Sequence, residues 1–299
     1  MITNTNTIND QNKTNLEIFP NQNKSTPSPQ NSKNLKIIII ILTIITLLIT
    51  ILTIILVFCL KESKSKKRAR IKLKEENEDN TILPPLVLNS TSGNHTHTII
   101  FLPGLTNTPE DFKIVFTDRL HFKKINDTKV VILRSPLVYV SYFNSTNYSW
   151  FDIYNFPMQN DSDYNFTDLK KSAKILETVI TNEANILNGK YENIIIGGHS
   201  QGACISLYHG YNTDKNLGGL FSFSGVLPPG DIREDKNDFK VYFGYWDKDN
   251  IILPSFFNES IQRIKDFKEF KLYVYKDHLH YVNDAETDDV SEFLNNIIK

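Results

Sequence analysis

The 299-residue chain has little cysteine and almost no net charge. Its two cysteines, Cys59 and Cys204, cannot form the dense disulfide framework of a small secreted protein, and this scarcity fits a reducing compartment. Lysine and arginine (33) balance aspartate and glutamate (34), so the chain as a whole gives no sign of a nucleic-acid-binding surface. A phosphate loop, a dinucleotide fingerprint and a metal-ligand cluster are also missing. We therefore expect no cofactor, no metal and no nucleic-acid partner, and we interpret His95 and His97 as solvated linker residues.

One long apolar run is present near the N-terminus. Residues from Ile37 to Leu60 are uncharged and are almost wholly Ile and Leu with scattered Thr. At about 1.5 Å per residue, such a helix is roughly 36 Å long, which is enough to cross a bilayer with some tilt. The run is too long for a typical buried core helix, and the apolar part of a signal peptide is shorter, about 7–15 residues. The sequence predicts one membrane-spanning helix over residues 36–60.

The composition divides the rest of the chain into three parts. Residues 1–35 are rich in Asn and Thr and cannot bury enough apolar surface to order themselves. Residues 61–96 begin with a dense Lys/Arg run and are predicted to form a basic juxtamembrane linker. Residues 97–299 alternate apolar strands with helical patterns, which is typical of one α/β domain with a parallel sheet.

A glycine-flanked serine follows an apolar run in the middle of this domain. Residues Gly198 to Gly202 read Gly-His-Ser-Gln-Gly, a G-x-S-x-G pattern. A strand that turns sharply into a helix crowds the positions two before and two after the turn, and glycine has no Cβ to clash there. The alternative is an ordinary Gly/Ser turn, but the preceding strand and following helix pattern favour a nucleophile elbow. Ser200 is then the nucleophile, with its Oγ exposed above the sheet.

An activated serine needs a base that is held by an acid, in the chain order Ser, then Asp or Glu, then His. His278 and His280 follow a predicted strand over residues 270–275, and Asp247 and Asp249 follow a predicted strand over residues 239–243. Either carboxylate can accept the imidazole N–H and stabilise the imidazolium. The residues alone leave both choices open.

Four separated motifs resemble the acyl-protein thioesterase and carboxylesterase (phospholipase/carboxylesterase) family of α/β-hydrolases. They lie between Thr98 and the C-terminus, and the Ser-Trp-Phe-Asp motif is the most distinctive of them. The resemblance implies an α/β-hydrolase fold, with a mostly parallel central sheet and helices on both faces, here preceded by one transmembrane helix. The motifs are Ile99 to Thr106, Ser149 to Ile153, the elbow with Gln201 after the nucleophile, and Phe223 to Pro228.

The same resemblance selects among the candidate partners of Ser200. The family's histidine lies five residues after a tyrosine and before an Asp-Val-x-x-Phe helix, which favours His280 over His278. The family's aspartate follows a His-Gly-x-x pattern, which favours Asp247 and leaves Asp249 in reserve.

Further roles are implied around this triad. The backbone N–H groups of Leu105 and Gln201 are the implied oxyanion donors. Trp150 is assigned to substrate binding as a wall of an acyl channel, because of its large apolar face. Asp152 is interpreted as a turn-capping carboxylate.

The implied activity is hydrolysis of carboxylic esters or thioesters through an acyl-enzyme, with a lipidated protein or a lysophospholipid as substrate. Two departures from the family pattern favour an alternative, a catalytically weak hydrolase fold that serves as an acyl-binding or scaffold module at the membrane. Pro103 stands where the family has a histidine, and the loop between Asp247 and Pro254 is longer than usual.

Two signals disagree about the side of the membrane. The basic run from Lys61 to Lys74 follows the span, so the positive-inside rule places the hydrolase domain in the cytosol. Many N-x-S/T sequons suggest a lumenal or extracellular, glycosylated surface instead, although an Asn-rich composition inflates their number. We expect a single-pass membrane protein with a cytosolic hydrolase domain. The sequons begin at Asn89, Asn94, Asn126, Asn144, Asn147, Asn160, Asn165 and Asn258.

Overall fold

The computed structural model describes residues 37–58, 61, 83–229, 232–236, 239–264 and 269–299. The chain separates into two compact units, Met1–Asp79 and Asn80–Lys299, and each is described by itself. The predicted tail over residues 1–35, Cys59 and the basic run beyond Lys61 lie outside the described residues.

The first unit contains the apolar helix Ile37–Phe58, with a mean hydropathy of 3.2 and no part of its most apolar window buried by protein. The helix contains four threonines, Thr43, Thr46, Thr50 and Thr53. Each hydroxyl donates a hydrogen bond to the carbonyl three residues earlier, at 2.7–2.9 Å. The helix therefore satisfies the hydroxyl groups of these threonines within its own backbone.

The second unit is built on a seven-stranded sheet with the order β1-β3-β2-β6-β7-β8-β9. Only the first pair, β1 with β3, is antiparallel, and the other five pairs are parallel. Every residue of the four central strands β2, β6, β7 and β8 is buried, as expected for a sheet covered on both faces. The strands are β1 (Leu86–Leu88), β2 (His97–Leu102), β3 (Thr128–Ile132), β6 (Ile194–His199), β7 (Gly219–Phe223), β8 (Val241–Trp246) and β9 (Phe270–Tyr275).

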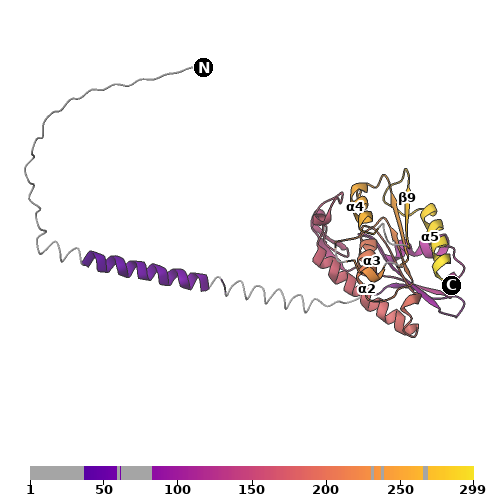
Figure 1. Ribbon diagram of the computed structural model, residues 1–299, viewed down its shortest axis with the longest axis horizontal. Coiled ribbons are helices and arrows are strands. Elements are labelled where there is room, and N and C mark those ends of the chain that lie inside the picture. The colour runs from indigo at the N-terminus through magenta and orange to yellow at the C-terminus, as the bar shows by residue number, and fades with distance from the viewer. Residues whose placement is uncertain (1–36, 59–60, 62–82, 230–231, 237–238, 265–268) are drawn as a thin grey trace, which may run out of the picture. The chain divides into compact units, whose positions relative to one another are not determined.

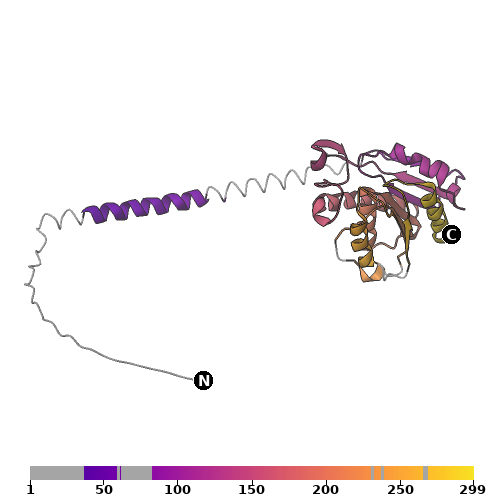
Figure 2. The ribbon, with the colours of Figure 1, turned by 90° about the horizontal axis from the view of Figure 1, so that it is seen from above.

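Helices cover both faces of this sheet. Side chains alternate across β2, so that Ile100 and Leu102 join the apolar cluster of α2, α3 and α4, whereas Ile99 and Phe101 join the cluster of α5. Figures 1 and 2 show the sheet running between α4 and α5. The predicted mostly parallel sheet with helices on both faces is confirmed. The helices are α2 (Phe166–Ile186), α3 (Gln201–Asn212), α4 (Pro254–Ile264) and α5 (Asp284–Ile297).

Shorter elements connect these layers. A separate hairpin of β4 (Leu137–Val140) and β5 (Ser145–Tyr148) lies between β3 and α2 in the chain. The short helices are η1 (Pro109–Phe112), η2 (Val115–Arg119, a π-helix), η3 (Ile125–Asp127), η4 (Ser141–Phe143), η5 (Asp161–Asp163), η6 (Tyr191–Asn193) and η7 (Glu234–Lys236).

The domain begins earlier than its predicted start at residue 97. Strand β1 lies inside the range predicted as linker, residues 61–96, and pairs with β3 along its whole length. His97 is 8% exposed in β2, and His95 is half-buried with its Nε2 2.8 Å from Thr98 Oγ1. The interpretation of these two histidines as solvated linker residues was wrong, because His97 lies in β2 and His95 lies in the connection between β1 and β2.

Candidate functional site

Ser200 lies at the turn between β6 and α3, in a conformation that L-residues rarely adopt. Its φ and ψ are 53° and −119°, and such strain is typical of functional positions. A Cβ on Gly202 would lie 2.0 Å from the carbonyl oxygen of Leu102, and one on Gly198 would lie 2.4 Å from the backbone of Gly202. Both glycines are therefore required by the close approach of backbone to backbone, as the G-x-S-x-G spacing predicts.

His280 follows β9 and is paired with a buried carboxylate. Its Nδ1 lies 2.6 Å from Oδ2 of Asp249, which is 3% exposed. The other oxygen of Asp249 accepts the backbone N–H groups of Ile251 and Ile252, at 2.9 Å each. When Nδ1 donates its hydrogen to this carboxylate, Nε2 is left with the lone pair of a base. Ser200 and His280 line the same cavity.

The structure corrects the choice of Asp247 as the acid. Asp247 is exposed, and its Oδ1 accepts the backbone N–H of Asp277 at 2.9 Å. The chain turns after Trp246, whose carbonyl accepts the N–H of Asp249 at 3.2 Å. This turn, in a loop longer than the family pattern, carries the reserve residue Asp249 to His280.

His278 is not near this carboxylate. Its ring packs on Trp246, with centroids 4.5 Å apart, and its Nδ1 lies 2.8 Å from the hydroxyl of Tyr281. The structure brings His280, and not His278, to a buried acid.

The two predicted oxyanion donors lie at the cavity of Ser200. Gln201 is the first residue of α3, so its N–H has no acceptor within the helix. Leu105 lies in the loop after β2 and also lines the cavity. The next residue, Thr106, has a φ of 66° and donates its N–H to the carbonyl of Tyr148 at 2.8 Å, which holds this loop in place.

The side chain of Gln201 fastens the Ser-Trp-Phe-Asp segment to the elbow. Its Oε1 accepts hydrogen bonds from Ser149 Oγ and Trp150 N, both at 3.0 Å, and its Nε2 donates to the carbonyl of Phe151 at 2.9 Å. Sequence reasoning missed this role, because the partners are about 50 residues apart in the chain.

Trp150 holds the loop after β2 instead of lining a channel. It is 1% exposed, it is not among the residues of the cavity wall, and its indole Nε1 donates to the carbonyl of Pro103 at 2.8 Å. The prediction that Trp150 lines the channel was therefore wrong, because its apolar face packs in the hydrophobic core. Asp152 accepts hydrogen bonds from the backbone and hydroxyl of Ser141, both at 2.6 Å, which agrees with its capping interpretation.

The cavity beside Ser200 has a volume of about 370 Å³ and a largely apolar wall. Tyr142 and Phe143 come from the short helix between β4 and β5, and their rings surround Phe156 at centroid distances of 5.0 and 5.9 Å. Sequence reasoning missed these aromatic residues, although the adjacent Tyr-Phe pair was a visible signal. An apolar cavity with a few polar groups at one end fits an acyl chain attached to a polar carbonyl. The remaining wall is formed by Leu105, Thr106, Asn107, Ile153, Met158, His199, Ser200, Gln201, Ile251 and His280.

A second imidazole, that of His199, lies beside the base. Its ring is 5.0 Å from that of His280 and 5.4 Å from that of Phe112, measured between centroids. Burial and the neighbouring His280 hold the pKa of His199 well below its usual value. Both its ring nitrogens lack a hydrogen-bond partner among the described residues, so this imidazole is neutral and does not compete for Asp249.

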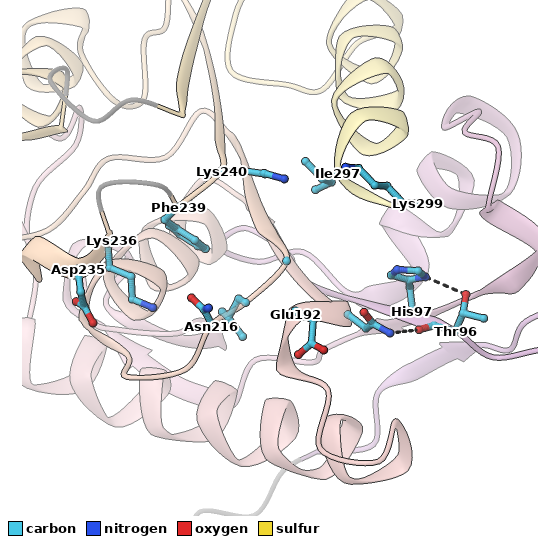
Figure 3. Close-up of a pocket in the computed structure, with 13 residues that line it drawn as sticks. Thr96, His97, Glu192, Asn216, Asp235, Lys236, Phe239, Lys240, Ile297 and Lys299 are labelled. Carbon is cyan, nitrogen blue, oxygen red and sulfur yellow. Dashed lines mark hydrogen bonds between the residues drawn. The ribbon is translucent and has the colours of Figure 1, made fainter.

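A larger cavity, of about 600 Å³, lies at the opposite edge of the sheet. Residues at or just before the amino ends of β2, β7 and β8 line it. Figure 3 shows Lys236 pointing toward Asn216 at one side and His97 bonded to Thr96 at the other. No serine is among its lining residues, and sites in such sheets form at the carboxyl ends of the strands. We assign the chemistry to the smaller cavity. Within the described part of the chain, no cluster of three or more His, Cys, Asp or Glu side chains is arranged for a metal ion.

Comparison with known proteins places this geometry in a family. The model of the phospholipase/carboxylesterase family matches residues 85–298. The chain is similar to acyl-protein thioesterase 1 of Candida albicans, with 30% identity over 213 residues, which are 67% of this chain and 92% of that protein. It is also similar to acyl-protein thioesterase 1 homolog 2 of Dictyostelium discoideum, with 28% identity over 56% of this chain and 76% of that protein.

A solved structure has the same fold. The crystal structure of Zea mays acyl-protein thioesterase 2 aligns with a TM-score of 0.58 and 20% identity, and it covers 72% of this chain and 99% of that one. The match over residues 85–298 includes the elbow, the loop after β2 and the Ser-Trp-Phe-Asp segment. The chain therefore belongs to the phospholipase/carboxylesterase family and is a serine hydrolase of the α/β-hydrolase fold.

Proposed function

We propose that the protein is a membrane-anchored esterase that cleaves acyl esters or thioesters with Ser200, His280 and Asp249. The observation that carries this proposal is the buried Asp249–His280 pair, 2.6 Å apart, at the cavity that also holds Ser200. The apolar wall supports an acyl chain as the group recognised. The names of the relatives support a lipidated protein as substrate, and a lysophospholipid presents the same kind of acyl carbonyl.

The Asp249–His280 hydrogen bond and the cavity that His280 shares with Ser200 support the following reaction. His280 Nε2 takes the proton of Ser200 Oγ while Asp249 stabilises the imidazolium, and the alkoxide attacks the acyl carbonyl. The N–H groups of Leu105 and Gln201 stabilise the negative oxygen of the tetrahedral intermediate. His280 then gives the proton to the leaving alcohol or thiol, and water hydrolyses the acyl-enzyme by the same steps.

The membrane anchor is the second part of the proposal. The helix Ile37–Phe58 is long and apolar enough to cross a bilayer, and the Lys/Arg run that follows it in the sequence supports a cytosolic hydrolase domain. An anchored enzyme meets lipidated substrates at raised local concentration, which supports the two proposed substrate classes.

A serine-reactive fluorophosphonate probe tests activity and anchoring together. We expect the full chain to be labelled in the membrane pellet after an alkaline carbonate wash. A variant that lacks residues 37–58 should be labelled in the supernatant. An unlabelled wild type would contradict the proposed chemistry, whereas a labelled wild type in the supernatant would contradict only the anchor. Labelling without multiple turnover of a thioester would favour the acyl-binding module.

The substitution Trp150→Phe is expected to lower kcat about tenfold and to leave KM within about twofold of the wild-type value. The change removes the indole hydrogen bond to Pro103 O and so loosens the backbone at Leu105. The effect is smaller than direct removal of one oxyanion donor, which lowers kcat by a factor of about 10²–10³. Steady-state kinetics with a short ester measures both constants. Ser172→Ala removes a hydroxyl that donates to the carbonyl of the same tryptophan, and it serves as the matched control for packing. A rise in KM without a fall in kcat would contradict the positioning role.

A further inference from the structure

A carboxylic acid is buried behind the proposed triad. Glu286 of α5 is 0% exposed, and its Oε2 accepts a hydrogen bond from the indole Nε1 of Trp246 at 3.1 Å. Its Oε1 has no hydrogen-bond partner among the described residues and packs against Gly244, where a Cβ would lie 3.2 Å away. Burial of an acid in such a place is costly, so its presence needs a physical explanation.

Trp246 connects this acid to both loops of the site. It ends β8, and its carbonyl accepts the N–H of Asp249 at 3.2 Å, which forms the turn that carries the proposed acid. Its ring packs on His278 at 4.5 Å and on Tyr275 at 4.7 Å, measured between centroids. These two residues flank the start of the loop that bears His280. The hydrogen bond from Trp246 to Glu286 therefore anchors a residue whose carbonyl holds the Asp249 turn and whose ring packs against the start of the His280 loop.

The electrostatic surroundings of Glu286 favour its neutral form. The titratable groups that face it are Asp249 from the turn, Asp289 from α5, Tyr242 from β8 and Tyr275 from β9. In the described part of the chain, no lysine, arginine or histidine forms an ion pair with it. Burial raises the pKa of the Glu286 carboxyl to about 8, because it outweighs the lowering by the hydrogen bonds from Trp246 and from the backbone of Asn283, and the negative charges of Asp249 and Asp289 act in the same direction as burial.

We propose that Glu286 is a positioning residue that works as a neutral acid, holds Trp246 and thereby keeps Asp249 and His280 paired, and sets an alkaline limit to activity when it ionises. This inference rests on the proposed function of the triad. Ionisation places a second buried negative charge near Asp249, and the two charges repel strongly where water is excluded. The loops that Trp246 connects then separate from α5, and the base loses its alignment.

The pH profile of kcat tests this role directly. With a short ester between pH 6 and 9.5, we expect the wild-type kcat to be halved near pH 8, the pKa of Glu286, and to fall up to about tenfold per pH unit above it. Glu286→Gln keeps the shape and the acceptor for Trp246, so its kcat should change less than about twofold over the alkaline range. Asp288→Asn, at an exposed position of the same helix, should follow the wild type. An equal alkaline fall in Glu286→Gln would overturn the inference.

Stability supplies a readout that does not depend on turnover. Between the ordinary pKa of 4.5 and the raised pKa of about 8, the folded protein retains a proton that the unfolded chain has released. The wild type should therefore lose stability relative to Glu286→Gln as the pH rises through this window, with a constant difference above it. If the difference between the urea unfolding midpoints of the wild type and Glu286→Gln does not change with pH, the inference is overturned. If this difference appears but no pH supports hydrolysis of any ester, the proposed function fails instead.

Discussion

Asparagine in place of Asp249 is expected to lower kcat by about 10⁴. The Oδ1 of the new side chain can keep the hydrogen bonds from Ile251 and Ile252, so its NH₂ group then faces Nδ1 of His280. A donor at that position forces the proton of the imidazole onto Nε2, and a protonated Nε2 cannot accept the proton of Ser200. Steady-state hydrolysis of a short ester at pH 7.5 measures the loss.

The matched control for this prediction lies two residues earlier. Asp247→Asn removes the charge of an exposed carboxylate that contacts only the start of the His280 loop through Asp277 N. Its kcat should stay within about threefold of the wild type, because surface polar contacts contribute little. The reverse order, with Asp247→Asn the more damaged variant, would show that the long loop rearranges when substrate binds.

Alanine in place of Ser200 is expected to lower kcat about a millionfold. The change deletes the atom that forms the acyl bond, while the backbone stays at a φ that serine and alanine adopt at similar cost. Mass spectrometry of the protein after mixing with a slow ester gives a second measurement. The wild type should gain the mass of one acyl group, and the variant should gain none.

Residual turnover by the Ser200→Ala variant is informative in its own right. The oxyanion donors and the cavity remain, so a rate about 10³–10⁴ above that in water should persist. An acyl adduct on the variant would place the nucleophile elsewhere. The Cys204 thiol does not serve as a second nucleophile, because burial raises its pKa to about 12 and so keeps it protonated.

The nucleophile elbow could be predicted because its sequence pattern spans only five consecutive residues. Gly198 and Gly202 are required by contacts within the turn and with the neighbouring strand, at 2.0–2.4 Å from a hypothetical Cβ. The central strands were equally readable, because burial on both faces leaves continuous apolar runs. The choice of His280 relied on its spacing from Tyr275, and strand β9 does end at that tyrosine.

The acid could not be chosen in this way. Asp247 and Asp249 occupy one loop, and the decision depends on where the backbone of Asp277 binds Asp247 and on the turn from Trp246 to Asp249. The role of Trp150 was hidden for the same reason, since its partner Pro103 lies 47 positions away in the chain. Glu286 is one of many acidic residues in the sequence, and its partner Trp246 lies 40 positions away in the chain.

The sequence alone predicted the fold class, Ser200 as the nucleophile, the chain order of its partners and an apolar helix long enough for a membrane. These depend on steric demands and periodicities that act between residues close in the chain. The tertiary contacts were needed to show that Asp249 holds His280, that Gln201 holds the Ser-Trp-Phe-Asp segment, that Trp150 holds the loop after β2, and that Glu286 accepts a hydrogen bond from Trp246. Hydrogen bonds between distant segments depend on how loops pack, and their distances are not encoded in any local pattern.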